Sequence, residues 1–178
     1  GNRLLGSFNK EEATQNELGW KGTIRDGRTS ISVAYFDIDY QDRAFQVVAP
    51  NPGGPGLIEY VTNIGDSEQN GLEFEITTKA TDNLTLSIAA GWVDSEFSKG
   101  TVLADGTDLS GLTPSGTIDN GFLIGADYAT TLSNGTDFTL SAQWSHTGQG
   151  IGMPVVGALK NPSYDVVNIQ AGFSSGAW

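Results

Sequence analysis

One histidine and no cysteine limit the chemistry that this chain can perform. His146 is the single histidine among 178 residues, and cysteine is absent. Without thiols there is no disulfide framework, no thiol nucleophile and no cysteine-based metal site. One imidazole cannot build a His-rich metal centre, and no Ser/His/acid set can be assembled around it. We expect no enzymatic activity, no metal and no cofactor. We interpret His146 as solvated or structural, with ligand contact as the alternative.

Four acidic residues lie close together in the sequence and raise the question of a calcium site. Asp94, Glu96, Asp105 and Asp108 surround one expected loop, and carboxylate oxygens are ligands that Ca²⁺ prefers. Their spacing matches no defined calcium-binding loop. We interpret them as solvated loop acids, with calcium binding as the alternative.

The composition favours a chain of strands and turns. Hydrophobic residues make up 38% and charged residues 17%, and there are 24 glycines, a balance that suits β architectures. The net charge of -12 argues against nucleic-acid binding, because neutralising phosphates requires clustered Lys and Arg. No run approaches the ~20 apolar residues of a membrane-spanning helix, so any membrane crossing must use strands.

The clearest element is an alternating hairpin at residues 71–97. Apolar side chains recur at every second position of each limb, and polar ones fill the positions between, which is the period of a β-strand. The turn lies at residues 81–83. One face carries Leu72, Phe74, Ile76, Thr78 and Ala80 on the first limb and Leu84, Leu86, Ile88, Ala90 and Trp92 on the second.

Similar alternation predicts about seven strands and no significant helix. The first limb of the hairpin belongs to a strand that begins near residue 58, and further strands begin near residues 15, 29, 122, 138 and 166. In the strand that begins at Thr29, apolar residues change face between Tyr35 and Phe36, which predicts a bulge or a strand that leaves the apolar zone. Residues 49–57 should be loop, because three prolines and three glycines interrupt a strand ladder.

The predicted connections alternate between short and long. Turns at residues 25–28, 81–83 and 133–135 are short, whereas the connections after Tyr40, Phe97 and Thr147 are long. One rim of the sheet should therefore be tight and the other heavily looped. Outer-membrane barrels have this asymmetry, with short periplasmic turns and longer extracellular loops.

Two architectures fit amphipathic strands: a soluble or surface-exposed β-sandwich acting as a structural or adhesion module, and a transmembrane β-barrel. The apolar stripes span ~9–11 residues, the length that a tilted strand needs to cross the hydrocarbon layer. Trp92 and Trp144 would lie near the outer interface, and Trp20 and Tyr128 nearer the inner one. The stripes beginning at Leu72, Leu84 and Phe138 carry no charge. We favour an all-β fold, an antiparallel segment of a larger transmembrane barrel.

Several segments, taken in order, also resemble the barrel of TonB-dependent outer-membrane receptors. Residues 17–22 (ELGWKG) with 25–28 (RDGR) are similar to one of their hairpins. Residues 35–42 (YFDIDYQD) and 63–73 (NIGDSEQNGLE) resemble the next two strands, and 81–86 also fits. The resemblance covers about residues 8–97. Asn16 departs from it, since the family usually has an aromatic there.

The resemblance implies a receptor in the bacterial outer membrane that takes up a scarce nutrient with TonB-coupled energy. A ferric siderophore, cobalamin or a glycan would be the substrate. The implied partners are outer-membrane lipid, the receptor's own plug domain, the TonB system and the nutrient, and no nucleic acid. The family barrel has about 22 strands, so residues 1–178 would form part of it. The plug domain and the closing strands would lie outside this chain.

On this interpretation, polar side chains of the lumen or the outer rim are the ligand-binding candidates. Contact with the plug domain or with lumen water is the favoured role, and direct ligand contact is the alternative. We expect no catalytic residue. The candidates are Glu73, Glu75, Lys79, Gln143, His146, Asn168 and Gln170.

Overall fold

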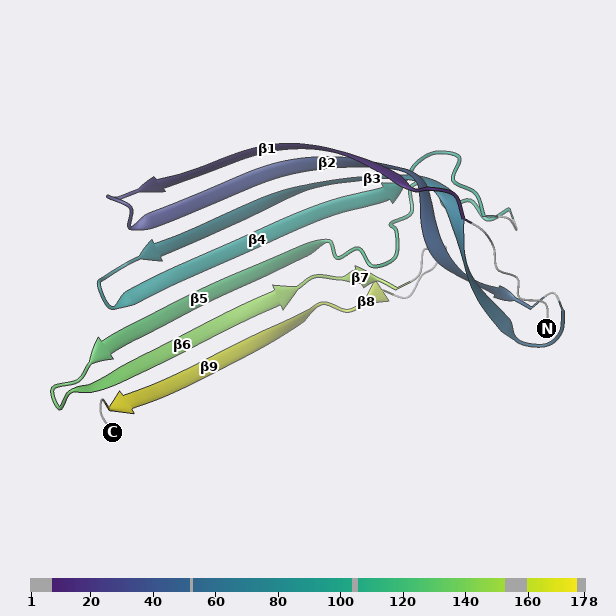
Figure 1. Ribbon diagram of the computed structural model, residues 1–178. Coiled ribbons are helices and arrows are strands. Elements are labelled where there is room, and N and C mark those ends of the chain that lie inside the picture. The colour runs from purple at the N-terminus through teal and green to yellow at the C-terminus, as the bar shows by residue number, and fades with distance from the viewer. Residues whose placement is uncertain (1–7, 52, 104–105, 153–159, 176–178) are drawn as a thin grey trace.

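The computed structural model describes residues 8–51, 53–103, 106–152 and 160–175, and strands with their connections account for all of this part. The predicted all-β fold is confirmed, and the described residues contain no helix. Seven antiparallel strands form one sheet in which neighbours in sequence are neighbours in space (Figure 1). They are β1 (Glu12–Ile24), β2 (Thr29–Pro50), β3 (Leu57–Lys79), β4 (Leu84–Phe97), β5 (Asn120–Thr131), β6 (Thr136–Thr147) and β9 (Tyr164–Ser175). The predicted number of seven strands is also confirmed.

Short turns join the strands at one rim, as expected. Arg25, Asp26 and Gly27 adopt positive φ angles between β1 and β2. Gly27 does so without steric cost because it lacks a Cβ. Between β3 and β4, the Thr81 hydroxyl accepts the backbone N–H groups of Asn83 and Leu84. These two turns also contact each other, because Arg28 forms an ion pair with Asp82 at 3.0 Å. The tight rim is therefore held by local hydrogen bonds.

The opposite rim carries the long connections. β2 and β3 continue past the rest of the sheet as a two-stranded ribbon that bends away (Figure 1). The prediction of loop over residues 49–57 was wrong at its ends, since Pro50 pairs with Leu57 and the turn is confined to residues 51–56. A proline is tolerated there because each ribbon strand has a neighbour on one side only.

The apolar residues of β2 change face without a bulge. The β2–β3 register is unbroken from Thr29 to Tyr40, and the shifts come later, beside Arg43. A bulge at residues 35 and 36 was therefore the wrong alternative. Instead, β2 leaves the apolar zone. Tyr40 is in register with Ser67, and Ser67 is in register with Phe97. The connection after β4 covers this face of the sheet. Phe36 covers Gly71 on the same face, where a Cβ would collide with its ring.

A small hydrophobic core lies under the connection at residues 98–119. Phe97 is 1% exposed and Leu109 is 0% exposed, and together with Ile64 they form the buried cluster. Backbone hydrogen bonds fix the connection, since Phe97 donates to the Leu112 carbonyl at 2.9 Å and Leu109 to that of Thr101 at 2.8 Å. The glycine-rich loop of the sequence is thus an ordered cap on the sheet.

The connection after β6 contains two more short strands. β7 (Gly150–Ile151) pairs with β8 (Lys160–Asn161), and a bridge joins Ile118 to Gly150. The cap and this small ribbon therefore meet at the looped rim. No helix in the described part of the chain is both long and apolar enough to span a membrane.

Candidate functional site

The strand register sorts the side chains of the sheet into an apolar and a polar face. One cross-strand row runs through all seven strands on the apolar face. Its members are Gly22, Ile31, Ile76, Ile88, Ile124, Trp144 and Val167. The adjacent row on the polar face consists of Thr23, Ser30, Thr77, Ser87, Gly125, Gln143 and Asn168. The alternation predicted for single strands therefore continues across the whole sheet.

The strands are staggered as they are in a barrel. Ile31 lies two residues after the start of β2, whereas Trp144, in the same row, lies eight residues after the start of β6. A shift of six residues is ~20 Å along the strands, over four strand spacings that together span ~19 Å. The strands thus slant by about 45° against the rim of short turns, close to the 35–45° tilt of barrel strands.

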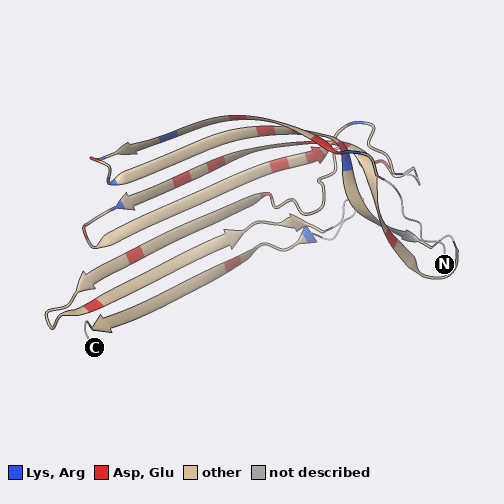
Figure 2. Cartoon of the chain, in the orientation of Figure 1, with Lys and Arg blue, Asp and Glu red and all other residues tan. Residues whose placement is uncertain are grey.

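The apolar face ends in aromatic residues and then becomes acidic. On β4 it extends from Leu84 to Trp92, and Trp92 shares its row with Tyr35. The next two rows toward the looped rim contain five acids on β2, β3 and β4: Asp37, Asp39, Glu68, Asp94 and Glu96. Figure 2 shows acidic positions near the end of β4 at the looped rim. Nine residues from Leu84 to Trp92 match the ~9–11 residues of a membrane-crossing strand.

Six of the seven predicted ligand-binding residues lie on the polar face. Gln143 is directly opposite Asn168, and Gln170 is opposite Ser141, whose hydroxyl donates to Asp127 at 2.7 Å. Lys79 shares the row of Gln170 but lies four strands away, at ~19 Å. The register therefore collects the amides on β6 and β9 and leaves the charged candidates on β3.

Glu73 and Glu75 border a shallow hollow on β3, β4, β5 and β6. Its volume is about 350 Å³. The hollow is open above Gly91, where a Cβ would meet no atom within 4 Å. Ala89 and Gly121 line it as well. The hollow is an acidic surface that a ligand or a domain inside a barrel can contact.

His146 lies on the apolar face, across the sheet from the other six candidates. Its row contains Phe122 and Asp165. The His146 Nδ1 atom is 3.0 Å from an Asp165 carboxylate oxygen, the Trp144 ring lies 6.2 Å away, and 25% of the histidine side chain is exposed. It is near the looped rim, as expected. The alternation from Phe138 to Trp144 already indicated this face.

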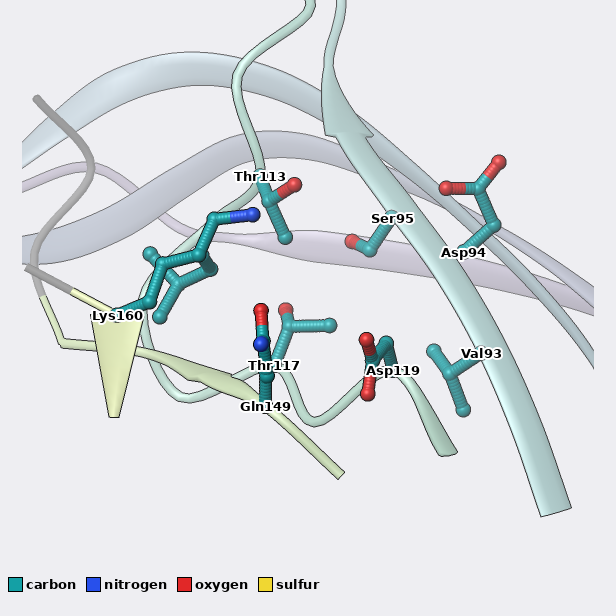
Figure 3. A pocket seen from close by; sticks show the side chains of 9 residues that line it. Val93, Asp94, Ser95, Thr113, Thr117, Asp119, Gln149 and Lys160 are labelled. Carbon is teal, nitrogen blue, oxygen red and sulfur yellow. The ribbon is translucent and has the colours of Figure 1, made fainter. Parts of the chain in front are cut away.

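A second, smaller pocket lies at the looped rim, where β4, the cap and the β7–β8 ribbon meet (Figure 3). Its volume is about 90 Å³. The residues around it are Val93, Asp94, Ser95, Thr113, Thr117, Asp119, Gln149, Ile151 and Lys160. We call it the rim pocket. Sequence reasoning missed it, because its charged members lie on β4 and in two separate connections, with no regular spacing.

The loop acids that the structure describes do not assemble into a metal site. Asp94 and Glu96 project from β4 toward the outward face, and Asp105 lies outside the described residues. Within the described ranges, no group of three or more His, Cys, Asp or Glu side chains can hold a metal ion. Asp108 instead accepts the backbone N–H of Ser110 at 2.9 Å. The calcium alternative gains no support from this geometry.

Comparison with known proteins then identifies the sheet. Residues 1–178 match the family described as TonB dependent receptor-like, beta-barrel. The chain belongs to this family. The resemblance found over residues 8–97 therefore extends over the whole chain.

A relative of this receptor segment is the metal-pseudopaline receptor CntO of Pseudomonas aeruginosa. It is 24% identical over 166 residues, which are 93% of this chain and 22% of CntO. The chain thus spans about a fifth of this curated relative's length.

Two solved receptors have the same fold as this TonB-dependent receptor segment. The ferric yersiniabactin uptake receptor FyuA from Yersinia pestis matches with a TM-score of 0.75 and 15% identity, over 95% of this chain and 23% of FyuA. The ferric preacinetobactin receptor BauA from Acinetobacter baumannii matches with a TM-score of 0.67 and 18% identity, over 93% of this chain and 23% of BauA.

Family membership confirms the barrel over the sandwich. TonB-dependent receptors are outer-membrane proteins of Gram-negative bacteria and are transporters, not enzymes. In such barrels the apolar face meets lipid and the polar face lines the lumen, with long loops outside the cell and short turns in the periplasm. The hollow beside Glu73 and Glu75 accordingly faces the lumen, and the rim pocket lies at the extracellular mouth.

Proposed function

We propose that this chain forms seven strands of a receptor barrel that imports a metal chelate across the outer membrane with TonB-coupled energy. The match to the TonB-dependent receptor family over residues 1–178 is the observation that carries the proposal. The remaining strands and a plug domain would complete the receptor outside this chain. This division follows from the family, whose barrels have about 22 strands around a plugged lumen.

Among ferric siderophores, cobalamin and glycans, we favour the metal-chelate class. The relatives named above are receptors for a metal–pseudopaline complex, ferric yersiniabactin and ferric preacinetobactin. The polar face offers carboxylates and amides, which suit contacts with hydroxyl and amine groups of a chelate or with polar groups of the plug. Of these two roles for Glu73 and Glu75, and for the amides of β6 and β9, we propose plug contact as the main one.

The experiment is an uptake assay with the complete receptor. Cells that lack their own chelate receptors would express it, with and without a functional TonB protein, and would receive ⁵⁵Fe-loaded siderophores, radiolabelled cobalamin and a labelled oligosaccharide. We expect accumulation of at least one metal chelate in cells with TonB and background levels in cells without it.

Two outcomes would overturn this proposal. Accumulation of cobalamin or oligosaccharide without any metal chelate would contradict the substrate class. Equal chelate accumulation in both strains would contradict energy coupling, because passive flow through a barrel does not depend on TonB.

A further inference from the structure

The rim pocket is built by three segments that the backbone holds together. Val93 donates its N–H to the Asp119 carbonyl at 2.9 Å, which fixes the end of the cap against β4. Asp119 in turn donates to the Gln149 carbonyl at 3.3 Å, and Ile151 donates to that of Thr117 at 3.1 Å. The walls are therefore fixed by main-chain contacts and do not depend on which side chains fill the pocket.

The polar side chains around this pocket are largely unused by the protein itself. In the described residues, no hydrogen bond or ion pair engages the Lys160 ammonium, the Gln149 amide or the Thr117 hydroxyl. Asp119 uses one carboxylate oxygen, which accepts from the Asn120 amide at 2.9 Å. Its second oxygen has no such partner. A cation, a carboxylate, an amide and hydroxyls thus surround one small volume.

Figure 3 shows how these groups are arranged. Lys160 extends over the pocket from the β8 side, and Asp119 lies toward β4, with Thr117 and Gln149 between them. Asp94 carries its carboxylate on the other side of the β4 strand. Lys160 and Asp119 form no ion pair with each other in the described structure. The pocket therefore presents two separated, opposite charges.

Opposite charges at two ends of a small pocket fit a small group that carries both charges. An ammonium of the protein and an amide N–H bind a carboxylate, and a carboxylate of the protein binds an amine. A phosphate or sulfate group would meet repulsion from Asp119. A bare metal ion would lack a ligand set among the described residues. A volume of about 90 Å³ admits only a few non-hydrogen atoms.

We propose that the rim pocket binds an amino-carboxylate group at the exposed end of the imported chelate. The carboxylate contacts Lys160 and Gln149, and the amine contacts Asp119. The identification of this group as part of an imported chelate rests on the proposed uptake function. The binding of an amino-carboxylate group to the pocket does not depend on that function. Because main-chain hydrogen bonds already shape the pocket, little ordering is needed when the group binds.

The first test measures binding of three small probes to the complete purified receptor by ligand-observed NMR titration. Glycine carries both charges, acetate lacks the amine and glycinamide lacks the carboxylate. We expect saturable glycine binding in the millimolar range, as suits a ligand with so few atoms, and weaker binding of the other two probes.

Two variants then remove one partner each. Lys160→Gln should weaken glycine binding about fivefold or more and abolish the preference for glycine over glycinamide. Asp119→Asn should have a similar effect on affinity and abolish the preference for glycine over acetate. Glu96→Gln is the matched control, since Glu96 lies on the outward face of β4 and does not line the pocket, and it should bind glycine like the unchanged receptor.

The pattern of lost preferences separates direct contact from a general structural effect. Absence of saturable glycine binding would overturn the proposal, as would equal affinities in Lys160→Gln and the unchanged receptor. Uniform loss of all three probes in both variants would also overturn it, because a distorted pocket would lose every ligand alike.

The uptake assay distinguishes failure of this inference from failure of the proposed function. If TonB-dependent chelate uptake persists and the variants bind glycine normally, the receptor function stands and the pocket assignment falls. If the probe pattern is as expected and no chelate is imported, the amino-carboxylate site stands and the uptake function falls.

Discussion

Asp108 links the ends of a tight loop in the cap through Ser110. Its carboxylate accepts the Ser110 N–H at 2.9 Å, while the Ser110 hydroxyl accepts the Gly100 N–H at 2.9 Å. The hydrogen bonds from the Ser110 side chain and backbone lower the pKa of the Asp108 carboxyl below its ordinary value of 3.8. Both bonds favour the ionised form, because a carboxylate accepts more strongly than a neutral acid.

Because the pKa of Asp108 is lowered in the folded loop, the stability of this loop depends on pH. The charged carboxylate stabilises the folded loop fully above the ordinary pKa, and this stabilisation is lost as the pH falls through the lower folded-state value. We expect the amide of Ser110 to exchange hydrogen faster below about pH 4, relative to the intrinsic rate, than at pH 6. Hydrogen exchange read by mass spectrometry on the complete receptor would measure this.

The Asp108→Asn variant provides the comparison for this pH effect. In this variant the exchange of the Ser110 amide should not become faster below about pH 4, because the Asn side chain does not titrate. Asp26→Asn, in a turn at the opposite rim, should leave the effect unchanged. The same acid step in Asp108→Asn and the unchanged receptor would show that another group titrates.

Among elements, the cap shows how a glycine-rich connection can be ordered. Leu109 is fully buried beside Phe97 and Ile64, and the Phe45 ring meets Phe97 edge-on with centroids 5.3 Å apart. Arg43 lies over the Phe45 ring at 4.8 Å and donates to the Ser67 hydroxyl at 3.0 Å. The cap is therefore held to β2, β3 and β4 by apolar contact.

Leu109→Ala should loosen the cap without unfolding the barrel. Removing a fully buried leucine side chain costs about 2–5 kcal/mol, and here that loss falls on a small local core. We expect proteolysis within residues 98–119 to become at least tenfold faster in the complete receptor. Limited proteolysis with gel and mass-spectrometric readout would measure it.

Val102→Ala is the matched control in the same connection, because Val102 is 48% exposed. It should change the proteolysis rate little. Equal rates for Leu109→Ala and the unchanged receptor would contradict a cap held by its core. Simultaneous loss of the folded barrel would show that the core stabilises more than the cap.

At the scale of the whole molecule, the sheet separates two environments. Ile88 and Ser87 are neighbours on β4 that project to opposite faces, and Ile88 is 43% exposed on the apolar one. It lies midway between Leu84 and Trp92, hence near the middle of the hydrocarbon layer. Ser87 faces the lumen.

Ile88→Lys should therefore impair folding into lipid far more than Ser87→Lys. A lysine at the midplane of the lipid-facing surface costs about 2–4 kcal/mol, whereas a lumen position tolerates charge. Urea titrations of the complete receptor in lipid vesicles, followed by tryptophan fluorescence, would give the two free energies of unfolding. Equal destabilisation by both substitutions would contradict the assignment of lipid and lumen faces.

The strands could be predicted from the sequence because a β-strand has a two-residue period. The alternation around Leu72, Trp92 and Phe138 was enough to assign these residues to the apolar face. The cross-strand rows of the sheet continue this alternation through all seven strands. The same pattern placed Gln143 and Asn168 on the polar face. The same alternation also predicts that His146 lies on the apolar face, because it continues the stripe of Phe138 and Trp144.

The parts that could not be predicted depend on contacts without a sequence period. The β2–β3 ribbon extends as far as Pro50 and Leu57, because each of its strands pairs on one side only and can therefore accommodate a proline. The composition of this segment does not show that its strands have only one neighbour. Leu109 is buried by residues 40 or more positions away in β2 and β3, such as Phe45 and Ile64. Lys160 reaches the rim pocket only because β8 pairs with β7.

The sequence by itself determined the all-β class, the short and long rims, the two faces and the family of this protein. Each of these follows from local periodicity, turn residues or ordered motifs, which physical chemistry fixes over a few positions. Only the tertiary structure decided the slant of the strands, the cap with its core and the partners of the rim pocket. Those features require the register between distant strands, which brings Asp119 from the connection after β4 together with Gln149 and Lys160 from the connection after β6.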